Sequence, residues 1–195
     1  MCSSDLTYQL NESDLTLLRE TGVSEPDIAH CLKVAEKALE IAERTGEELD
    51  MELVGRGALF HDLGKAKTHD IEHGKNGAEL GVRLGLPHPI LGIMEKHVRG
   101  GLTAEEAMEL GLPVKDYTLR TLEECIVIYA DRLVDIITDP NQIVASELEA
   151  EARFEEILTN KVRYGKNAPT LERYLGYHLE IQGLIQSASR DRTPS

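Results

Sequence analysis

The hydrophobic pattern is helical along nearly the whole chain. Apolar residues recur every three or four positions, and the strict alternation of a half-buried strand is nearly absent. In one stretch the residues Ile28, Leu32, Ala35, Leu39 and Ala42 form a single stripe, while lysine and glutamate fill the opposite arc. This pattern predicts an all-α fold in which each helix buries one face.

Capping residues and glycines divide this pattern into separate helices. Ser24 is a candidate N-cap of a helix that runs to about Gly46. A second helix starts near Asp50 and stops at Gly64, which we expect to be a left-handed C-cap residue. Further helices are expected over residues 76–84, 89–98, 104–110, 122–137, 145–163 and 170–186. Two pairs have the spacing of capping boxes: Thr103 with Glu106, and Thr121 with Glu124.

Length and composition favour one domain. A chain of 195 residues with 41% hydrophobic content can bury one substantial core. We therefore expect a single domain over residues 1–195, with a compact bundle over 24–140, a C-terminal helical extension over 141–187 and a disordered tail over 188–195.

The charge limits the partners. A formal net charge of -14 leaves too little basic surface to neutralise a row of phosphates, so the main partner is neither a nucleic-acid polymer nor an anionic membrane. A small anionic substrate would need a local cation. The acidic surface is compatible with a monomer and with a homodimer.

The cysteines and the apolar runs indicate a cytoplasmic protein. Cys2, Cys31 and Cys125 form neither an even set nor a CxxC pair, so reduced thiols are expected. The longest apolar runs are too short to span a membrane, and the first residues lack a basic and then apolar signal sequence.

The candidate chemistry centres on His61-Asp62-Leu63-Gly64-Lys65, at the end of a predicted helix. Other histidines and aspartates accompany it: the full candidate ligand set is His30, His61, Asp62, His73, His97 and Asp131. Imidazole nitrogens and carboxylate oxygens without a thiolate suit one or two divalent metal ions, which could be Mn, Fe, Ni, Co, Mg or Zn. This set favours a metal-dependent hydrolase.

Each of these residues also has an ordinary structural explanation. His30 lies at the border of an apolar stripe, and a histidine such as His61 is favoured near a helix C-terminus in any case. Asp131 could be the wet edge of a core helix, alongside an equally exposed Arg132 or Asp135, because an ionised carboxylate there must be solvated, paired or metal-bound. The metal interpretation therefore depends on the residues acting as a cluster.

The segments that carry these residues resemble the HD superfamily of metal-dependent phosphohydrolases. Residues 28–35 are similar to the first-ligand helix of that family, residues 58–65 to its signature and residues 128–133 to its last-ligand helix. Residues 71–80 and 93–97 resemble the additional histidine segments of its two-metal branch. The resemblance covers about residues 27–137, and the absence of a GYP triplet argues against the cyclic-dinucleotide phosphodiesterase subgroup of that name.

The resemblance implies an HD-domain helical bundle with additional C-terminal helices. It assigns His30, His61, Asp62 and Asp131 to a first metal, and His73 and His97, with Asp62 bridging, to a second that the one-metal branch lacks. It implies that water activated by the metal cleaves a phosphomonoester or phosphodiester bond of a small phosphorylated substrate, for which we expect a nucleotide. Asp62 and Lys65 are the catalytic candidates, and the substrate-binding candidates are Lys65, Lys96 and Arg99.

Two alternatives remain open. The same ligands could bind a metal and a nucleotide in a non-catalytic regulatory module. Separately, His69-Asp70-Ile71-Glu72-His73 reads as the inverted zinc-peptidase motif H-x-x-E-H, with Glu72 as general base. The peptidase reading is disfavoured because Gly64 and Gly74 closely flank a segment that would have to lie within a stable helix.

Overall fold

The computed structural model describes residues 8–191, and within that range the chain forms helices and no strand. This confirms the predicted all-α class. The α-helices are α1 Glu12–Thr21, α2 Glu25–Thr45, α3 Met51–Phe60, α4 His73–Arg83, α5 His88–Lys96, α6 Ala104–Glu109, α7 Leu122–Ile137, α8 Glu147–Ala152, α9 Phe154–Asn160, α10 Val162–Gly165 and α11 Ala168–Asp191. Two 3-10 helices complete the set: η1 Leu63–Ala66 and η2 Val98–Gly100.

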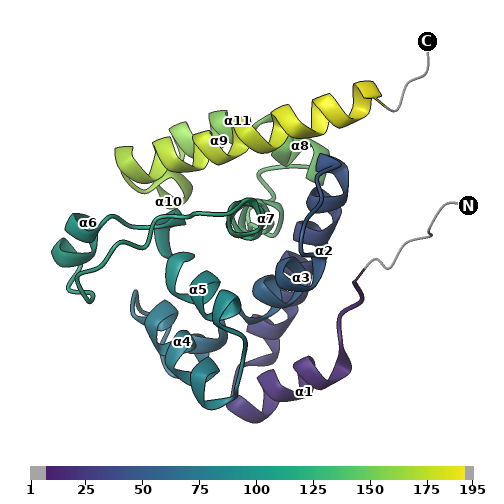
Figure 1. The fold of residues 1–195 in the computed structure, drawn as a ribbon. Helices are drawn as coiled ribbons and strands as arrows, with labels where there is room; N and C mark the ends of the chain where they lie inside the picture. Colours follow the sequence, from purple (N-terminus) through teal and green to yellow (C-terminus); the bar gives the residue numbers. More distant parts are fainter. Residues whose placement is uncertain (1–7, 192–195) are drawn as a thin grey trace, which may run out of the picture.

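Helix α7 lies at the centre of the bundle. Figure 1 shows α2 and α3 on one side of it, and the long helix α11 crossing over its other side. Helices α4 and α5 pack against each other below this layer, and α5 also contacts α3. The central position of α7 explains its continuous apolar sequence, since neighbours cover it on more than one face.

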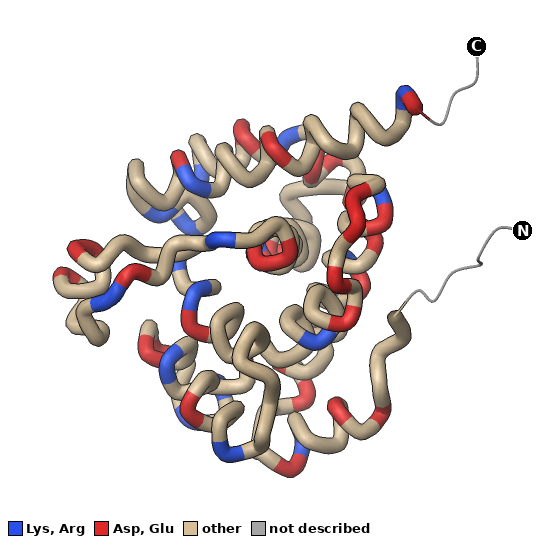
Figure 2. Tube along the Cα trace, in the orientation of Figure 1, with Lys and Arg blue, Asp and Glu red and all other residues tan. Residues whose placement is uncertain are grey.

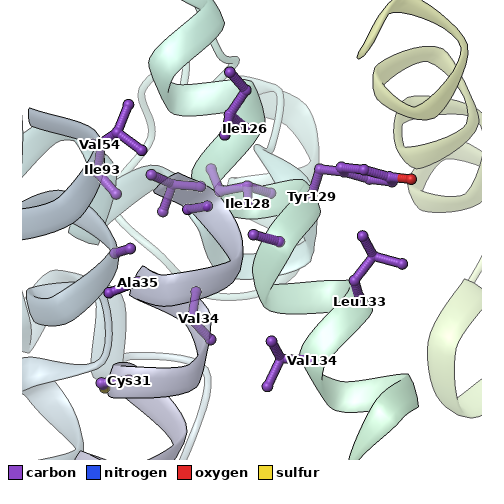
Figure 3. Packing of buried hydrophobic residues seen from close by; sticks show 14 of the residues in the cluster. Cys31, Val34, Ala35, Val54, Ile93, Ile126, Ile128, Tyr129, Leu133 and Val134 are labelled. Carbon is purple, nitrogen blue, oxygen red and sulfur yellow. The ribbon is translucent and has the colours of Figure 1, made fainter. Parts of the chain in front are cut away.

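The core forms where α2, α3, α5 and α7 meet. Figure 3 shows Val34 of α2 and Ile128 of α7 in one cluster of buried side chains, which also includes Val54 and Ile93. Each of these four side chains is fully buried. Burial of such a side chain contributes roughly 1.5–3 kcal/mol, so these contacts hold in place the helices that carry the candidate ligands.

Several predicted boundaries are confirmed. The Ser24 hydroxyl accepts a hydrogen bond from the Asp27 amide, and α2 ends at Gly46 in the left-handed conformation. Both predicted capping boxes are present, at the starts of α6 and α7. Helix α7 has the predicted bounds.

Gly64 corrects one prediction. Helix α3 ends at Phe60, and Gly64 lies in η1 without a positive φ, so it is not a left-handed cap. A Cβ atom at this position would lie 1.8 Å from the carbonyl oxygen of His73. The glycine is needed because α4 approaches η1 closely, which a helix-end rule cannot reveal.

The C-terminal region differs most from the prediction. The expected helix over 145–163 is three short helices, broken at Arg153 and Lys161, where the backbone leaves the helical conformation. These breaks let the segment turn over α7 and bury Phe154 against Tyr129. Helix α11 continues to Asp191, so residues 188–191 of the expected tail are helical, and residues 192–195 lie outside the described range.

Two further differences lie elsewhere in the chain. Helix α1, capped by Asn11 and buried through Leu18, is absent from the prediction. Helix α4 begins at His73, three residues earlier than expected. Of the predicted free cysteines, Cys31 and Cys125 are free and buried, and Cys2 lies outside the described residues.

Charged positions of both signs are interspersed over the helices, as Figure 2 shows. None of the helices between residues 8 and 191 combines the length and the apolar character that crossing a membrane requires.

Candidate metal centre

Five separate segments bring the six candidate ligands together. His30 lies in α2, His61 and Asp62 follow α3, and Asp131 lies in α7. The other two ligands are the histidine that opens α4 and the one that follows α5. The ligands surround a cavity of about 290 Å³, with the fully buried His61 behind its wall. The structure therefore gathers residues that are more than a hundred positions apart in sequence.

Asp62 lies at the middle of this cluster and uses its two oxygens differently. Its Oδ2 atom is 3.3 Å from His61 Nε2 and 3.8 Å from His30 Nε2. Its Oδ1 atom is 3.4 Å from the Nε2 atoms of both His73 and His97. The carboxylate thus faces one pair of imidazoles with each oxygen, as a ligand that bridges two cations would.

Asp131 completes the first half of the cluster. Its Oδ1 atom is 3.0 Å from His30 Nε2 and 3.5 Å from His61 Nε2. Three groups of three residues have ligand atoms close enough to share an ion: His30, His61 and Asp62; Asp62, His73 and His97; and His30, Asp131 and Asp135. The first two groups share Asp62, and the third joins Asp131 to His30.

The backbone fixes the tautomer of three of these histidines. In each of His61, His73 and His97 the Nδ1–H donates a hydrogen bond to a carbonyl oxygen three residues earlier, at 2.6–2.7 Å; the acceptors are Ala58, Asp70 and Met94. The neutral imidazole then carries its lone pair on Nε2, which points into the cluster. The Nε2 atom of His61 is buried and has no hydrogen-bond partner among the described residues. Inward lone pairs beside carboxylates fit a divalent cation.

The pKa values of the cluster also favour metal binding. Burial opposes ionisation of Asp62 and Asp131, but the adjacent imidazoles, His61 foremost, hold the pKa of both carboxyl groups well below the usual range. Burial, and after it the charge of His97, lowers the pKa of His73 to about 4. Ionised carboxylates and a neutral imidazole are the forms that bind metal.

His61 responds to its carboxylate neighbours. Burial disfavours its charged form, yet Asp62 and Asp131 raise the pKa of His61 well above the usual value. A cation at this position would replace the proton, because both neutralise the same two carboxylates.

Glycines place the second pair of histidines. A Cβ atom at Gly74 would lie 2.7 Å from the carbonyl oxygen of Met94, and one at Gly64 would overlap the backbone of His73. Helix α4 can therefore begin directly against both η1 and α5. This close approach brings His73 Nε2 to 2.7 Å from His97 Nε2.

Two of the three substrate-binding candidates lie at the cavity, and the third does not. Lys65 lines the cavity, and its Nζ atom lies 2.5 Å from Asp62 Oδ2. Arg99 also lines the cavity. Lys96 does not, since its ammonium binds Glu124 at 2.5 Å.

The peptidase alternative finds no support in the geometry. Residues 69–72 precede the first turn of α4, so His69 and His73 do not lie on one helix face. His69 is exposed and its Nε2 atom is 3.1 Å from Asp27. The two histidines of the H-x-x-E-H motif therefore do not form a zinc site.

Among the cavity-lining residues that the sequence does not identify as site residues are Arg132, Lys166 and Tyr174. Arg132 is 7% exposed, which corrects its interpretation as part of a wet helix edge. A charged residue within the apolar run of α7 is a signal that could have identified it. Lys166 and Tyr174 carry no such signal, because only the folding of the C-terminal helices brings them to the cavity.

Comparison with known proteins assigns this arrangement to a family. The family model described as HD domain matches residues 27–134. The chain is 40% identical over 178 residues to an uncharacterized protein of Methanocaldococcus jannaschii, covering 90% of this chain and 98% of that protein. The match extends beyond the HD segment into the C-terminal helices.

Two other similarities are more limited. A tRNA (cytidine(56)-2'-O)-methyltransferase of Picrophilus torridus is 40% identical over 122 residues, which are 63% of this chain but only 35% of that protein. The crystal structure of the PgpH phosphodiesterase HD domain of L. monocytogenes, in complex with cyclic-di-AMP, superposes with a TM-score of 0.57 at 18% identity, covering 92% of this chain and 98% of that one. At this identity the likeness concerns the fold.

Proposed function

The chain belongs to the HD domain family, and on that basis we propose that it is a phosphohydrolase that uses two divalent metal ions to cleave a phosphomonoester or phosphodiester bond of a small nucleotide. The observation that carries the proposal is the position of Asp62, whose two oxygens each face a separate pair of imidazoles. Two metal ions side by side can stabilise both the attacking and the leaving oxygen in phosphoryl transfer to water.

The proposed ligands divide at Asp62. His30, His61 and Asp131 would hold the first ion with Asp62 Oδ2, and His73 and His97 would hold the second with Asp62 Oδ1. When bound, the two ions supply an acidified water as nucleophile and withdraw charge from the attacked phosphoryl group. Neutral imidazoles would leave the positive charge of such ions largely intact, and the carboxylates would reduce the repulsion between them.

Lys65 contributes a fixed positive charge at the cavity wall. Burial opposes its charged form, but the contact with Asp62 raises the pKa of Lys65, so the ammonium stays protonated across the working pH range. It is 23% exposed and faces the cavity, where it would donate hydrogen bonds to a phosphoryl oxygen. Lys65 thus orients the phosphoryl group and does not exchange its proton.

The size and charge of the site support a small substrate. A cavity of about 290 Å³ lies just below the roughly 300–1,000 Å³ typical of small-molecule sites. The domain of L. monocytogenes was solved with cyclic-di-AMP, which supports a nucleotide as substrate here.

We also propose a cytoplasmic location, which the free cysteines Cys31 and Cys125 support.

Metal removal and replacement test the function. Protein purified without chelator is analysed for bound metals, then stripped and assayed against a panel of nucleoside mono-, di- and cyclic phosphates. We expect hydrolysis to disappear on stripping and to return with one or more of Mn, Fe, Co, Ni and Mg. Hydrolysis that survives rigorous metal removal would contradict the proposal.

The regulatory alternative has a different outcome in the same assay. A non-catalytic module would be stabilised against heat by a nucleotide in the presence of metal, but would not consume it. Product formation, followed by chromatography alongside the melting temperature, separates the two functions.

A further inference from the structure

Three cations form a wall of the cavity beside the candidate metal ligands. Arg99 comes from η2, Arg132 from α7 and Lys166 from the turn between α10 and α11. Asp135 contributes one carboxylate to the same wall. This cluster is distinct from Lys65, which is paired with Asp62 within the metal centre.

Arg132 is a buried charge with an unused donor. Its Nη2 atom donates a hydrogen bond of 3.1 Å to the Tyr174 hydroxyl, and its guanidinium lies 4.6 Å from the centre of the Tyr174 ring. Its contact with Asp135 is longer, at 3.6 Å. The Nε atom is buried and finds no partner among the described residues. Arg132 lines the cavity, and a buried guanidinium whose only carboxylate contact within residues 8–191 is 3.6 Å long favours an anion as a further ligand.

Helix α11 also holds the turn that carries Arg99. Arg99 has φ 52° and ψ 27°, in the left-handed region that few side chains adopt. Its carbonyl oxygen accepts a hydrogen bond of 3.3 Å from Arg173, and the next carbonyl, of Gly100, accepts one of 2.8 Å from the Tyr177 hydroxyl. These bonds keep the Arg99 backbone in place at the cavity rim.

Lys166 reaches the same cavity from an unusual backbone conformation. Its φ and ψ are 62° and -82°, directly after α10. Burial, and after it the charges of Arg132 and Arg99, lowers the pKa of Lys166. The three cations line the same cavity, and an anion between them would offset their mutual repulsion.

We propose that Arg99, Arg132 and Lys166 form a second anion subsite, which binds a phosphoryl group other than the one attacked at the metal centre. This inference rests on the proposed function and narrows its substrate class to molecules with two phosphoryl groups, such as a nucleoside bisphosphate. A single phosphoryl group would be neutralised by the metal ions and Lys65 alone.

The subsite depends on the C-terminal helices. Lys166 and Tyr174 lie outside residues 27–134, the part that matches the family model. The extension therefore supplies one cation of the subsite directly and fixes the other two through Tyr174, Arg173 and Tyr177. The C-terminal helices would therefore let the protein bind a substrate with two phosphoryl groups more tightly than a simple monoester.

Kinetics with two substrates test the subsite. The variants Arg99→Gln and Lys166→Gln are compared with the wild type on nitrophenyl phosphate and on adenosine 3',5'-bisphosphate, with metal bound. We expect kcat/KM for the bisphosphate to fall about tenfold in each variant, equivalent to about 1.4 kcal/mol, while kcat/KM for the monoester changes less than about twofold in Lys166→Gln. Lys161→Gln is the control, since Lys161 is an exposed cation of the same segment outside the cavity. Equal losses on both substrates, or no loss on either, would overturn the subsite.

Binding of inorganic phosphate separates this inference from the proposed function. Phosphate is titrated calorimetrically into metal-free wild type, the two variants and the control. Binding that weakens in Arg99→Gln and Lys166→Gln but not in Lys161→Gln supports the subsite even if the wild type hydrolyses neither substrate, in which case the proposed function fails alone. Equal phosphate affinity in all four proteins contradicts the subsite whatever the enzymatic result.

Discussion

The Nε2 atoms of His73 and His97 lie 2.7 Å apart, and the Nδ1–H of each ring is bound to a backbone carbonyl. In the neutral tautomers two lone pairs therefore face each other, and the 3.4 Å contacts of both with Asp62 add a negative oxygen. Such a set of atoms is stable only with a proton or a cation among them. Burial, and after it the charge of His97, lowers the pKa of His73 to about 4, so the His73 imidazole is neutral near neutral pH and its Nε2 lone pair is available to a cation.

Replacing His97 should therefore remove the second metal alone. We expect His97→Gln to bind about one equivalent of metal where the wild type binds about two, because His30, His61 and Asp131 are unaffected. Elemental analysis after dialysis measures the ratio. His88→Gln serves as control, since His88 is exposed and does not line the cavity; a wild type that binds one equivalent would rule out the two-metal site.

Removing the bridging charge should have a larger effect. Asp62→Asn keeps the size of the side chain but loses the carboxylate shared by both proposed ions, so we expect both metal equivalents to be lost. Hydrolysis should fall at least about a hundredfold, since the ions supply several kcal/mol of transition-state stabilisation. Asp70→Asn, at an exposed position, should leave both properties unchanged. Retention of full metal content in Asp62→Asn would refute the bridging role.

Two glycine substitutions should change stability in opposite directions. Gly64→Ala would force a Cβ into the His73 backbone, and we expect a loss of at least about 3 kcal/mol in the free energy of unfolding. Gly176→Ala, within α11 and with open space around it, should stabilise the protein by about 0.5–1 kcal/mol. Urea denaturation of both variants measures the difference, and a neutral Gly64→Ala would show that α4 does not depend on this approach.

The ion pair between α2 and α8 should make stability depend on pH. Burial opposes ionisation of Glu151, but bidentate hydrogen bonds from Arg44, at 2.7 and 2.9 Å, hold the pKa of Glu151 below its ordinary 4.5. Because the folded state binds the proton less tightly than the unfolded state, this contribution is full above pH 4.5 and is lost as pH falls through the folded pKa.

Glu151→Gln tests that dependence. We expect the variant to lose about 1–3 kcal/mol at pH 7, less than a fully buried pair because Arg44 is 32% exposed. The difference between wild type and variant, measured by denaturation at pH 7 and at pH 3, should shrink at the lower pH. A difference that is constant between the two would show that Glu151 contributes through packing alone.

The sequence identifies the centre of the candidate site but not its rim. His61 and Asp62 are adjacent in sequence, and His30 and Asp131 are polar residues in apolar helices, so the sequence alone identifies these four as candidate ligands. The sequence places Arg132 at a wet helix edge, because a helical projection cannot show that Tyr174 packs against it. The sequence does not identify Lys166, because no neighbouring residue indicates that this segment approaches α7 and η2.

Local rules have the same limit in the fold. Ser24, Gly46 and the capping boxes act through neighbours three or four residues away, and their predictions are confirmed. Gly64 acts through the backbone of His73 across a tertiary contact, so the cap rule gave the wrong reason for it. The predicted continuous helix over 145–163 is wrong for the same reason, since the segment breaks where it turns to pack over α7.

By itself, the sequence determined the all-α class, the main helix starts and the six residues able to hold metal, because helix periodicity, capping and ligand chemistry depend on residue type and short spacing. Only the tertiary structure decided that Asp62 faces two imidazole pairs, that α4 begins against Gly64 and that α11 brings Tyr174 and Lys166 to the cavity. These relationships arise from the packing of helices distant in the chain, and the position of a side chain across such a contact depends on every helix between them.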